Sequence, residues 1–268
     1  MQIRKIDHRH VWLLSGTGEG PLLANALVER GFLVSVSVVS YQASLPYRDF
    51  PLEAIWIGPI GGVEGVRQIL KKAEFDHYGF DFVLDATHPF ASLISSDLNR
   101  ACKEINQALL RFERIIESPS WVSCIASVED IPRESLSGKN FLFAIGSRNL
   151  LKAASSAIGG GSNVFARILD SPQSLRSAFS SSIPPDHFAV VRPFSSDPLG
   201  EVEKALCRKW SINSVVCRQS GGITQRLWQQ ISSELNLKLY LISRPVQTQM
   251  VETVYSLKAL LDRISTFK

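Results

Sequence analysis

Short apolar runs alternate with amphipathic stretches along almost the whole chain. The runs at residues 11–14, 34–39 and 82–85 are typical of strands that are buried on both faces of a parallel sheet. The stretches between them repeat apolar residues at helical spacing, as from Leu22 to Leu27, where Gly31 then ends the helix. This alternation predicts an α/β protein whose parallel sheets are covered by helices on both faces.

The same pattern gives an approximate map of the elements. In the first half we expect strands at 11–14, 34–39, 55–57, 82–85 and 108–112, and further helices at 63–73 and 91–105. In the second half we expect strands at 141–145, 164–169, 188–192, 214–218 and 238–242, and helices at 148–158, 172–179, 199–210, 223–235 and 251–264.

A polar stretch at residues 127–140 interrupts the alternation near the midpoint of the 268-residue chain. At about 150 residues per domain, this length suits two domains. We therefore predict two doubly wound, Rossmann-like α/β domains, an N-terminal one at 1–135 and a C-terminal one at 136–268.

Composition narrows the class of protein. Lysine and arginine number 29 against 25 acidic residues, a net charge of +4, and basic residues form no run longer than pairs such as Arg4-Lys5 and Lys71-Lys72, so we expect no nucleic-acid partner. The four cysteines lack metal-ligand spacing, which predicts no metal site and a reducing compartment. The chain has no apolar run of about 18 residues and its first ten residues are too polar for a secretory signal, so we expect a cytoplasmic protein without a membrane partner.

A glycine-rich loop follows the first predicted strand and precedes a helix. In such a loop the backbone comes close to a phosphate, and the helix N-terminus attracts the anion. A plain glycine turn is the alternative. The candidate cofactor-binding residues in this loop are Gly16, Thr17, Gly18, Glu19 and Gly20.

The end of the second strand bears on the choice of cofactor. An NAD site usually has an acidic residue there, but this chain continues with Ser40-Tyr41-Gln42. The absence of a carboxylate favours NADP, and Arg48 is the nearest cation.

Polar residues lie in or directly after four other strands. Thr87 and His88 end the first of these, where a structural histidine is the alternative to a cofactor contact. Arg111 and Arg114 either bind carboxylates or form a salt bridge with Glu113. In the second half, the candidate anion-binding residues are Arg167, Arg218, Ser220, Gly221 and Gly222.

Taken in order, these strings resemble the precorrin-6A reductases of cobalamin (vitamin B12) biosynthesis. The resemblance runs from about residue 10 to 262, and Asp85-Ala86-Thr87-His88-Pro89-Phe90-Ala91 is its most specific part. The other matching strings are 15–20, Ile57-Gly58-Pro59-Ile60-Gly61-Gly62, 111–114, 166–169, 220–222 and Arg244-Pro245.

The resemblance implies hydride transfer from NADPH, with NADH as the alternative, to one ring double bond of precorrin-6A or cobalt-precorrin-6A, giving precorrin-6B. It also implies that residues 1–135 form a dinucleotide-binding domain and that residues 136–268 complete a substrate cleft between the two domains. It implies no metal or flavin, Ser40, Thr87 and His88 as further cofactor contacts, and a tetrapyrrole substrate held by Arg111, Arg114, Arg167, Arg218 and residues 220–222. No catalytic residue is assigned, and His88 is a candidate proton donor. Many members have an arginine after the second strand where this chain has Ala43-Ser44, so we expect only a modest preference for NADPH.

Two other functions remain open at this point. One is a non-catalytic tetrapyrrole or nucleotide binder, favoured only by the missing arginine. The other is a different α/β enzyme, such as a methyltransferase, which would need an acidic residue after the second strand. Binding of NADPH or of S-adenosylmethionine would separate these functions.

Overall fold

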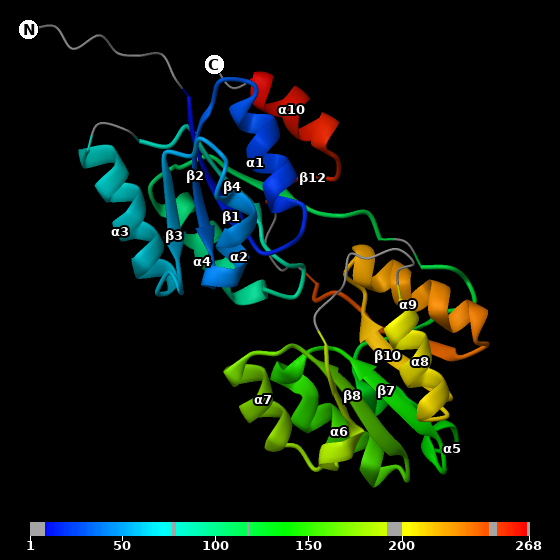
Figure 1. Cartoon of the computed structure of the whole chain (residues 1–268). Helices are drawn as coiled ribbons and strands as arrows, with labels where there is room; N and C mark the ends of the chain where they lie inside the picture. The colour runs from blue at the N-terminus through cyan, green and yellow to red at the C-terminus, as the bar shows by residue number, and fades with distance from the viewer. Residues whose placement is uncertain (1–8, 77–78, 117, 192–199, 247–250, 267–268) are drawn as a thin grey trace, which may run out of the picture. The chain divides into compact units, whose positions relative to one another are not determined.

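The computed structural model describes residues 9–76, 79–116, 118–191, 200–246 and 251–266. It divides the chain into two compact units, unit 1 (residues 1–115 and 245–268) and unit 2 (residues 116–244). Each unit contains one six-stranded parallel sheet (Figure 1). The predicted α/β class with parallel sheets is confirmed.

The sheet of unit 1 has the strand order β12-β5-β4-β1-β2-β3. Its strands are β1 (His10–Ser15), β2 (Leu33–Val38), β3 (Ala54–Ile57), β4 (Phe82–Ala86), β5 (Leu109–Phe112) and β12 (Glu252–Val254). Its helices are α1 (Gly20–Val28), α2 (Tyr41–Ser44), η1 (Leu45–Tyr47), α3 (Gly62–Phe75), α4 (Ser92–Glu104) and α10 (Leu257–Ser265).

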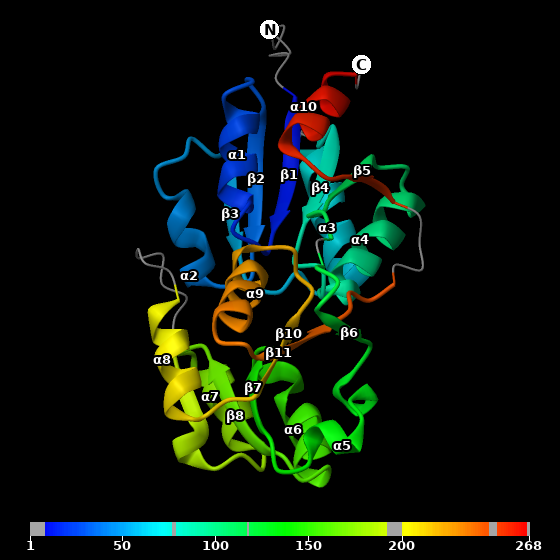
Figure 2. The same ribbon diagram turned by 90° about the vertical axis from the view of Figure 1, so that its right-hand side faces the viewer.

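Alternate residues of β1 enter two different hydrophobic clusters, as expected for a strand covered on both faces. Val11 and Leu13 pack with residues of α1 and α10, whereas Trp12 and Leu14 pack with residues of α3 and α4. Figure 2 shows the strands of this unit between the two layers of helices. The layers leave the carboxyl ends of β1, β2, β4 and β5 at one edge of the sheet, where ligands bind in such folds.

The sheet of unit 2 has the strand order β6-β11-β10-β7-β8-β9. Its strands are β6 (Ser123–Ile125), β7 (Asn140–Ala144), β8 (Asn163–Ile168), β9 (Phe188–Val190), β10 (Ser214–Arg218) and β11 (Lys238–Ile242). Its helices are η2 (Val128–Asp130), α5 (Arg133–Leu136), η3 (Ser147–Asn149), α6 (Leu150–Gly159), α7 (Pro172–Phe179), η4 (Pro185–His187), α8 (Glu201–Lys209) and α9 (Ile223–Glu234). One core includes residues of α6 and α7, and the other includes residues of α8 and α9.

The division of the chain differs from the predicted boundary between residues 135 and 136. The polar stretch 127–140 is part of unit 2, because Val128 and Leu136 are buried in its core and the preceding strand β6 pairs with β11. The predicted helix at 251–264 is wrong in its first residues: β12 pairs with β5, and α10 starts only after Ser256, whose hydroxyl accepts a hydrogen bond from Ala259 N. The C-terminal segment therefore belongs to unit 1.

None of the helices in the described part of the chain is long and apolar enough to span a membrane. All four cysteines are free thiols.

Candidate functional site

The glycine loop between β1 and α1 packs against the segment that follows β4. Gly16 N donates a hydrogen bond of 3.2 Å to Ala86 O. A Cβ atom added to Gly16 would lie 2.9 Å from His88 N, closer than side chains normally come to backbone. The fold thus brings together residues 15–20 and 85–91, which the sequence analysis identified as two separate candidate segments.

The three glycines of the loop have different roles. A Cβ on Gly20 would lie 1.9 Å from Ser15 Oγ and 2.3 Å from Tyr47 Oη, so Gly20 is required for packing, as Gly16 is. A Cβ on Gly18 would meet no atom of the described residues within 4 Å. The backbone at Gly18 is therefore open to a ligand. Helix α1 starts beside it without a side-chain hydrogen bond at its N-cap, Glu19, which suits an anion.

Glu19 ties this loop to the end of β5. Arg114 Nε donates a 2.6 Å hydrogen bond to Glu19 Oε1, and a second contact joins Arg114 Nη2 to Glu19 Oε2. Burial raises the pKa of Glu19, but the hydrogen bond and charge of Arg114 outweigh it, so the pKa lies below its ordinary value. Glu19 is accordingly ionised at neutral pH and holds the loop in place.

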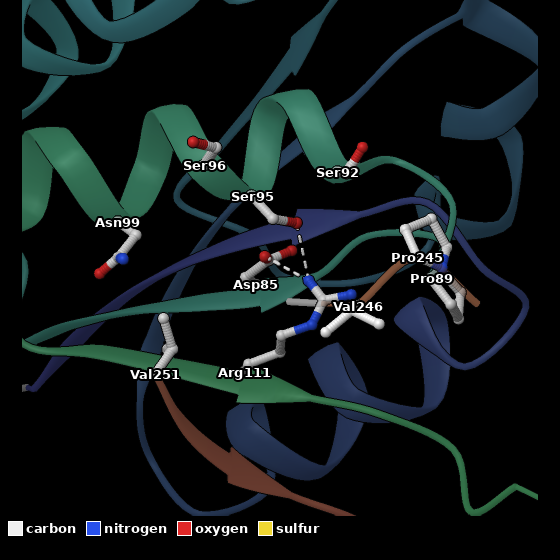
Figure 3. Close-up of a pocket in the computed structure, with 10 residues that line it drawn as sticks. All are labelled: Asp85, Pro89, Ser92, Ser95, Ser96, Asn99, Arg111, Pro245, Val246 and Val251. Atoms are coloured by element: carbon white, nitrogen blue, oxygen red, sulfur yellow. Dashed lines mark hydrogen bonds and ion pairs between the residues drawn. The ribbon is translucent and has the colours of Figure 1, made fainter. Parts of the chain in front are cut away.

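A buried charge cluster lies where β4 and β5 end side by side (Figure 3). Arg111 is 2% exposed; its Nη1 donates to Asp85 Oδ2 at 2.5 Å and its Nε donates to Glu113 Oε1 at 2.7 Å. Burial lowers the pKa of Arg111, but the two carboxylates outweigh it and raise the pKa. Thr87 belongs to the same cluster, since its backbone N and its hydroxyl both donate hydrogen bonds to Asp85 Oδ1.

A cavity of about 70 Å³ opens beside this cluster. Ser92, Ser95, Ser96 and Asn99 of α4 line it together with Arg111, as Figure 3 shows. Ser95 Oγ accepts a 2.8 Å hydrogen bond from Arg111 Nη1. Sequence reasoning missed these α4 residues, although polar side chains at positions 92, 95, 96 and 99 have the spacing of one helix face.

His88 is partly buried, and its ring is oriented by the turn that follows. Phe90 N donates a 3.2 Å hydrogen bond to His88 Nδ1. A neutral ring that accepts at Nδ1 carries its proton on Nε2. His88 can therefore donate a hydrogen bond from Nε2, whereas a proton donor needs the imidazolium form, in which Nδ1 no longer accepts from Phe90 N.

At the end of β2, Ser40 has a structural task. Its hydroxyl accepts a 3.3 Å hydrogen bond from Ala43 N and so caps α2. The short helix turns the chain back toward the glycine loop.

In unit 2, Arg167 forms a buried ion pair. Its Nε lies 3.3 Å from Glu203 Oε1, and the two side chains are 10% and 8% exposed. Burial lowers the pKa of Arg167 more than the charge of Glu203 raises it. Arg111, Arg114 and Arg167 thus all have acidic partners within their own units, and their predicted contact with substrate stays a prediction.

Arg218 and the loop after it lie at the carboxyl end of β10. Burial lowers the pKa of Arg218, and the nearby charge of Arg148, just after the neighbouring strand β7, lowers it further. Gly221, with a φ of +69°, turns the chain into α9, and its N donates to Gln225 Oε1 at 2.7 Å. An anion here would relieve the repulsion between the two guanidinium groups.

Comparison with known proteins identifies the family of the chain. A family model described as Precorrin-6x reductase CbiJ/CobK matches residues 10–265. The chain belongs to this family. The resemblance inferred from the strand-end strings is therefore confirmed, and membership in the Precorrin-6x reductase family excludes an unrelated α/β enzyme such as a methyltransferase.

Relatives of the chain are named either precorrin-6A reductase or cobalt-precorrin-6A reductase. This chain is 30% identical to a "Precorrin-6A reductase" of Mycobacterium tuberculosis over 92% of this chain and 93% of the relative. It is 29% identical to a "Cobalt-precorrin-6A reductase" of Synechocystis over 88% of each chain. The solved structure of CobK precorrin-6A reductase shares the fold, with a TM-score of 0.73, 23% identity and coverage of 97% of both chains.

Proposed function

We propose that this protein reduces one carbon–carbon double bond of the precorrin-6A or cobalt-precorrin-6A macrocycle in cobalamin biosynthesis. The observation that carries the proposal is the family match over residues 10–265, which spans both units. In this reaction NADPH supplies a hydride to one carbon and a proton reaches the adjacent carbon, giving precorrin-6B or its cobalt counterpart.

The glycine loop suits the cofactor diphosphate. Gly18 leaves its backbone open, while the N-terminus of α1 offers amide groups to an anion. Gly16, Thr17 and Glu19 shape the loop, and the contact of Gly16 with residues 86–88 brings Thr87 and His88 beside it. We assign NADPH as the cofactor, with NADH as a second possibility, because β2 is followed by Ser40 rather than by a carboxylate that would repel a 2′-phosphate.

His88 is our candidate for the proton donor. The hydrogen bond from Phe90 N to its Nδ1 orients the ring beside the glycine loop. Proton transfer to carbon requires the imidazolium form, so the hydrogen bond from Phe90 N must break when the ring takes up the proton. Hydride transfer itself needs mainly orientation of the two reactants.

The carboxylate side chains of the tetrapyrrole require cations. Arg218 and Arg148 lie near one another at the carboxyl edge of the second sheet, next to Ser220, Gly221 and Gly222. Arginine binds carboxylates with two parallel hydrogen bonds, so this pair suits an acidic macrocycle.

Arg218→Ala is expected to raise the KM for precorrin-6A about ten- to a hundredfold, because a shielded charge-assisted contact contributes about 1.5–3 kcal/mol. The affinity for NADPH should not change. Steady-state kinetics and NADPH titration measure both, with Arg208→Ala on the exposed face of α8 as control. An unchanged KM in a folded Arg218→Ala protein would contradict a substrate role for this arginine.

The proposal is tested most cheaply by cofactor binding. NADPH fluorescence should increase on mixing with the protein, and S-adenosylmethionine should not compete. A protein that binds NADPH but never reduces the macrocycle under anaerobic conditions would instead be a non-catalytic relative.

A further inference from the structure

Arg48 lies where the chain returns from the end of β2. After β2 the chain forms α2 and η1, and Arg48 follows η1 directly. Arg48 Nη2 donates a 2.6 Å hydrogen bond to Tyr41 Oη, and the guanidinium carbon lies 5.7 Å from the centroid of the Tyr41 ring. Both side chains are exposed. The pair is a cation held in a defined orientation on the surface.

The backbone that carries Arg48 is anchored to the glycine loop. The preceding residue, Tyr47, is 3% exposed, and its hydroxyl donates a 2.6 Å hydrogen bond to Ser15 Oγ at the end of β1. Tyr47 also contacts the ring of Phe50 edge-on, with ring centroids 6.0 Å apart. The backbone just before Arg48 is therefore anchored at the end of β1, where the loop that contains Gly18 begins.

This location matches one part of a dinucleotide. When the diphosphate lies on the loop after β1, the adenosine ribose lies over the end of β2. No ion pair of the described residues involves Arg48, so no aspartate or glutamate among them neutralises its charge. A guanidinium oriented by an aromatic hydroxyl can bind a phosphate dianion but gains little from a ribose hydroxyl.

We propose that Arg48, oriented by Tyr41, binds the ribose 2′-phosphate of NADPH and thereby determines the preference for NADPH over NADH. Arg48 supplies the cation that residues 40–44, directly after β2, lack. The inference rests on the proposed function, because it concerns the cofactor of that reaction. Tyr41 is a positioning residue that acts through Arg48.

The test is the affinity of the protein for NADPH, NADH and adenosine 2′,5′-bisphosphate, measured by fluorescence titration and calorimetry. Arg48→Ala is expected to raise the Kd of NADPH and of the bisphosphate about ten- to a hundredfold and to leave the Kd of NADH within about twofold. Arg48→Lys should keep part of the preference. Tyr41→Phe should weaken NADPH about threefold without affecting NADH, since it removes one orienting hydrogen bond. Arg30→Ala, an exposed arginine just after α1, is the matched control.

Two outcomes would overturn the role of Arg48. One is an unchanged ratio of the NADPH and NADH affinities in Arg48→Ala, whether both affinities stay the same or fall equally, and the other is wild-type protein that binds NADH more tightly than NADPH. Failure of the proposed function would look different, because the folded wild-type protein would then bind neither cofactor.

Discussion

Replacing Arg111 by alanine is expected to lower the free energy of unfolding by about 3–5 kcal/mol. The substitution leaves Asp85, 2% exposed, without its ion-pair partner, and it removes the contact to Glu113. An uncompensated buried carboxylate is costly because neither water nor a cation then stabilises its charge. The midpoint of urea unfolding near pH 7 measures the effect.

Arg100→Ala is the matched control for this experiment. Arg100 is an arginine of the same unit, but it forms an exposed pair with Glu104 on α4, and such pairs contribute less than about 1 kcal/mol. A stable Arg111→Ala protein with a raised KM for precorrin-6A would contradict the structural role and support the substrate contact expected from the sequence.

Gly18→Val is expected to weaken NADPH binding by about a hundredfold or more while the protein stays folded. A Cβ at this position meets no described atom within 4 Å, so the fold accepts it. The branched side chain would occupy the space through which a phosphate reaches the backbone, and the amide contacts of the bound anion would be lost. Fluorescence titration with NADPH and circular dichroism give the two readouts.

Two further glycine variants make this result specific. Gly159→Val introduces the same side chain at the end of α6, where an added Cβ also meets no described atom, and it should leave NADPH binding unchanged. Gly20→Val should fail to fold, because its Cβ would lie 1.9 Å from Ser15 Oγ. Normal NADPH binding by folded Gly18→Val would show that the loop does not hold the diphosphate.

The central strands and several helices could be predicted from the sequence because runs or helical spacing of apolar residues mark their buried faces. The bounds of β10, β11 and α7 agree with those expected from the apolar runs and from Ser171, which caps α7. The edge strands β6 and β12 could not be predicted in this way. Each is three residues long and is defined by pairing with a strand more than a hundred residues away in the chain, and such pairing leaves no local periodicity.

The sequence indicates which strand ends carry the candidate residues, but it does not indicate which of these residues contact one another. The spacing of Arg111 and Glu113 allows a salt bridge between them, but the second partner of Arg111, Asp85, depends on the register of β4 against β5. The partners Glu19 of Arg114 and Glu203 of Arg167 likewise come from distant segments that only the fold brings together. Arg48 can be recognised in the sequence as the nearest cation after β2, but its contact with Tyr41 is known only from the structure.

The proposed transfer of a hydride from NADPH to the macrocycle can be measured directly with an isotope label. The protein is incubated anaerobically with precorrin-6A and NADPH carrying deuterium on the transferable position, and the macrocycle is examined by absorption and mass spectrometry. We expect a change in the absorption spectrum, consumption of one NADPH per macrocycle and incorporation of one deuterium into the reduced ring system. An unchanged spectrum, with NADPH bound but not consumed, would contradict it.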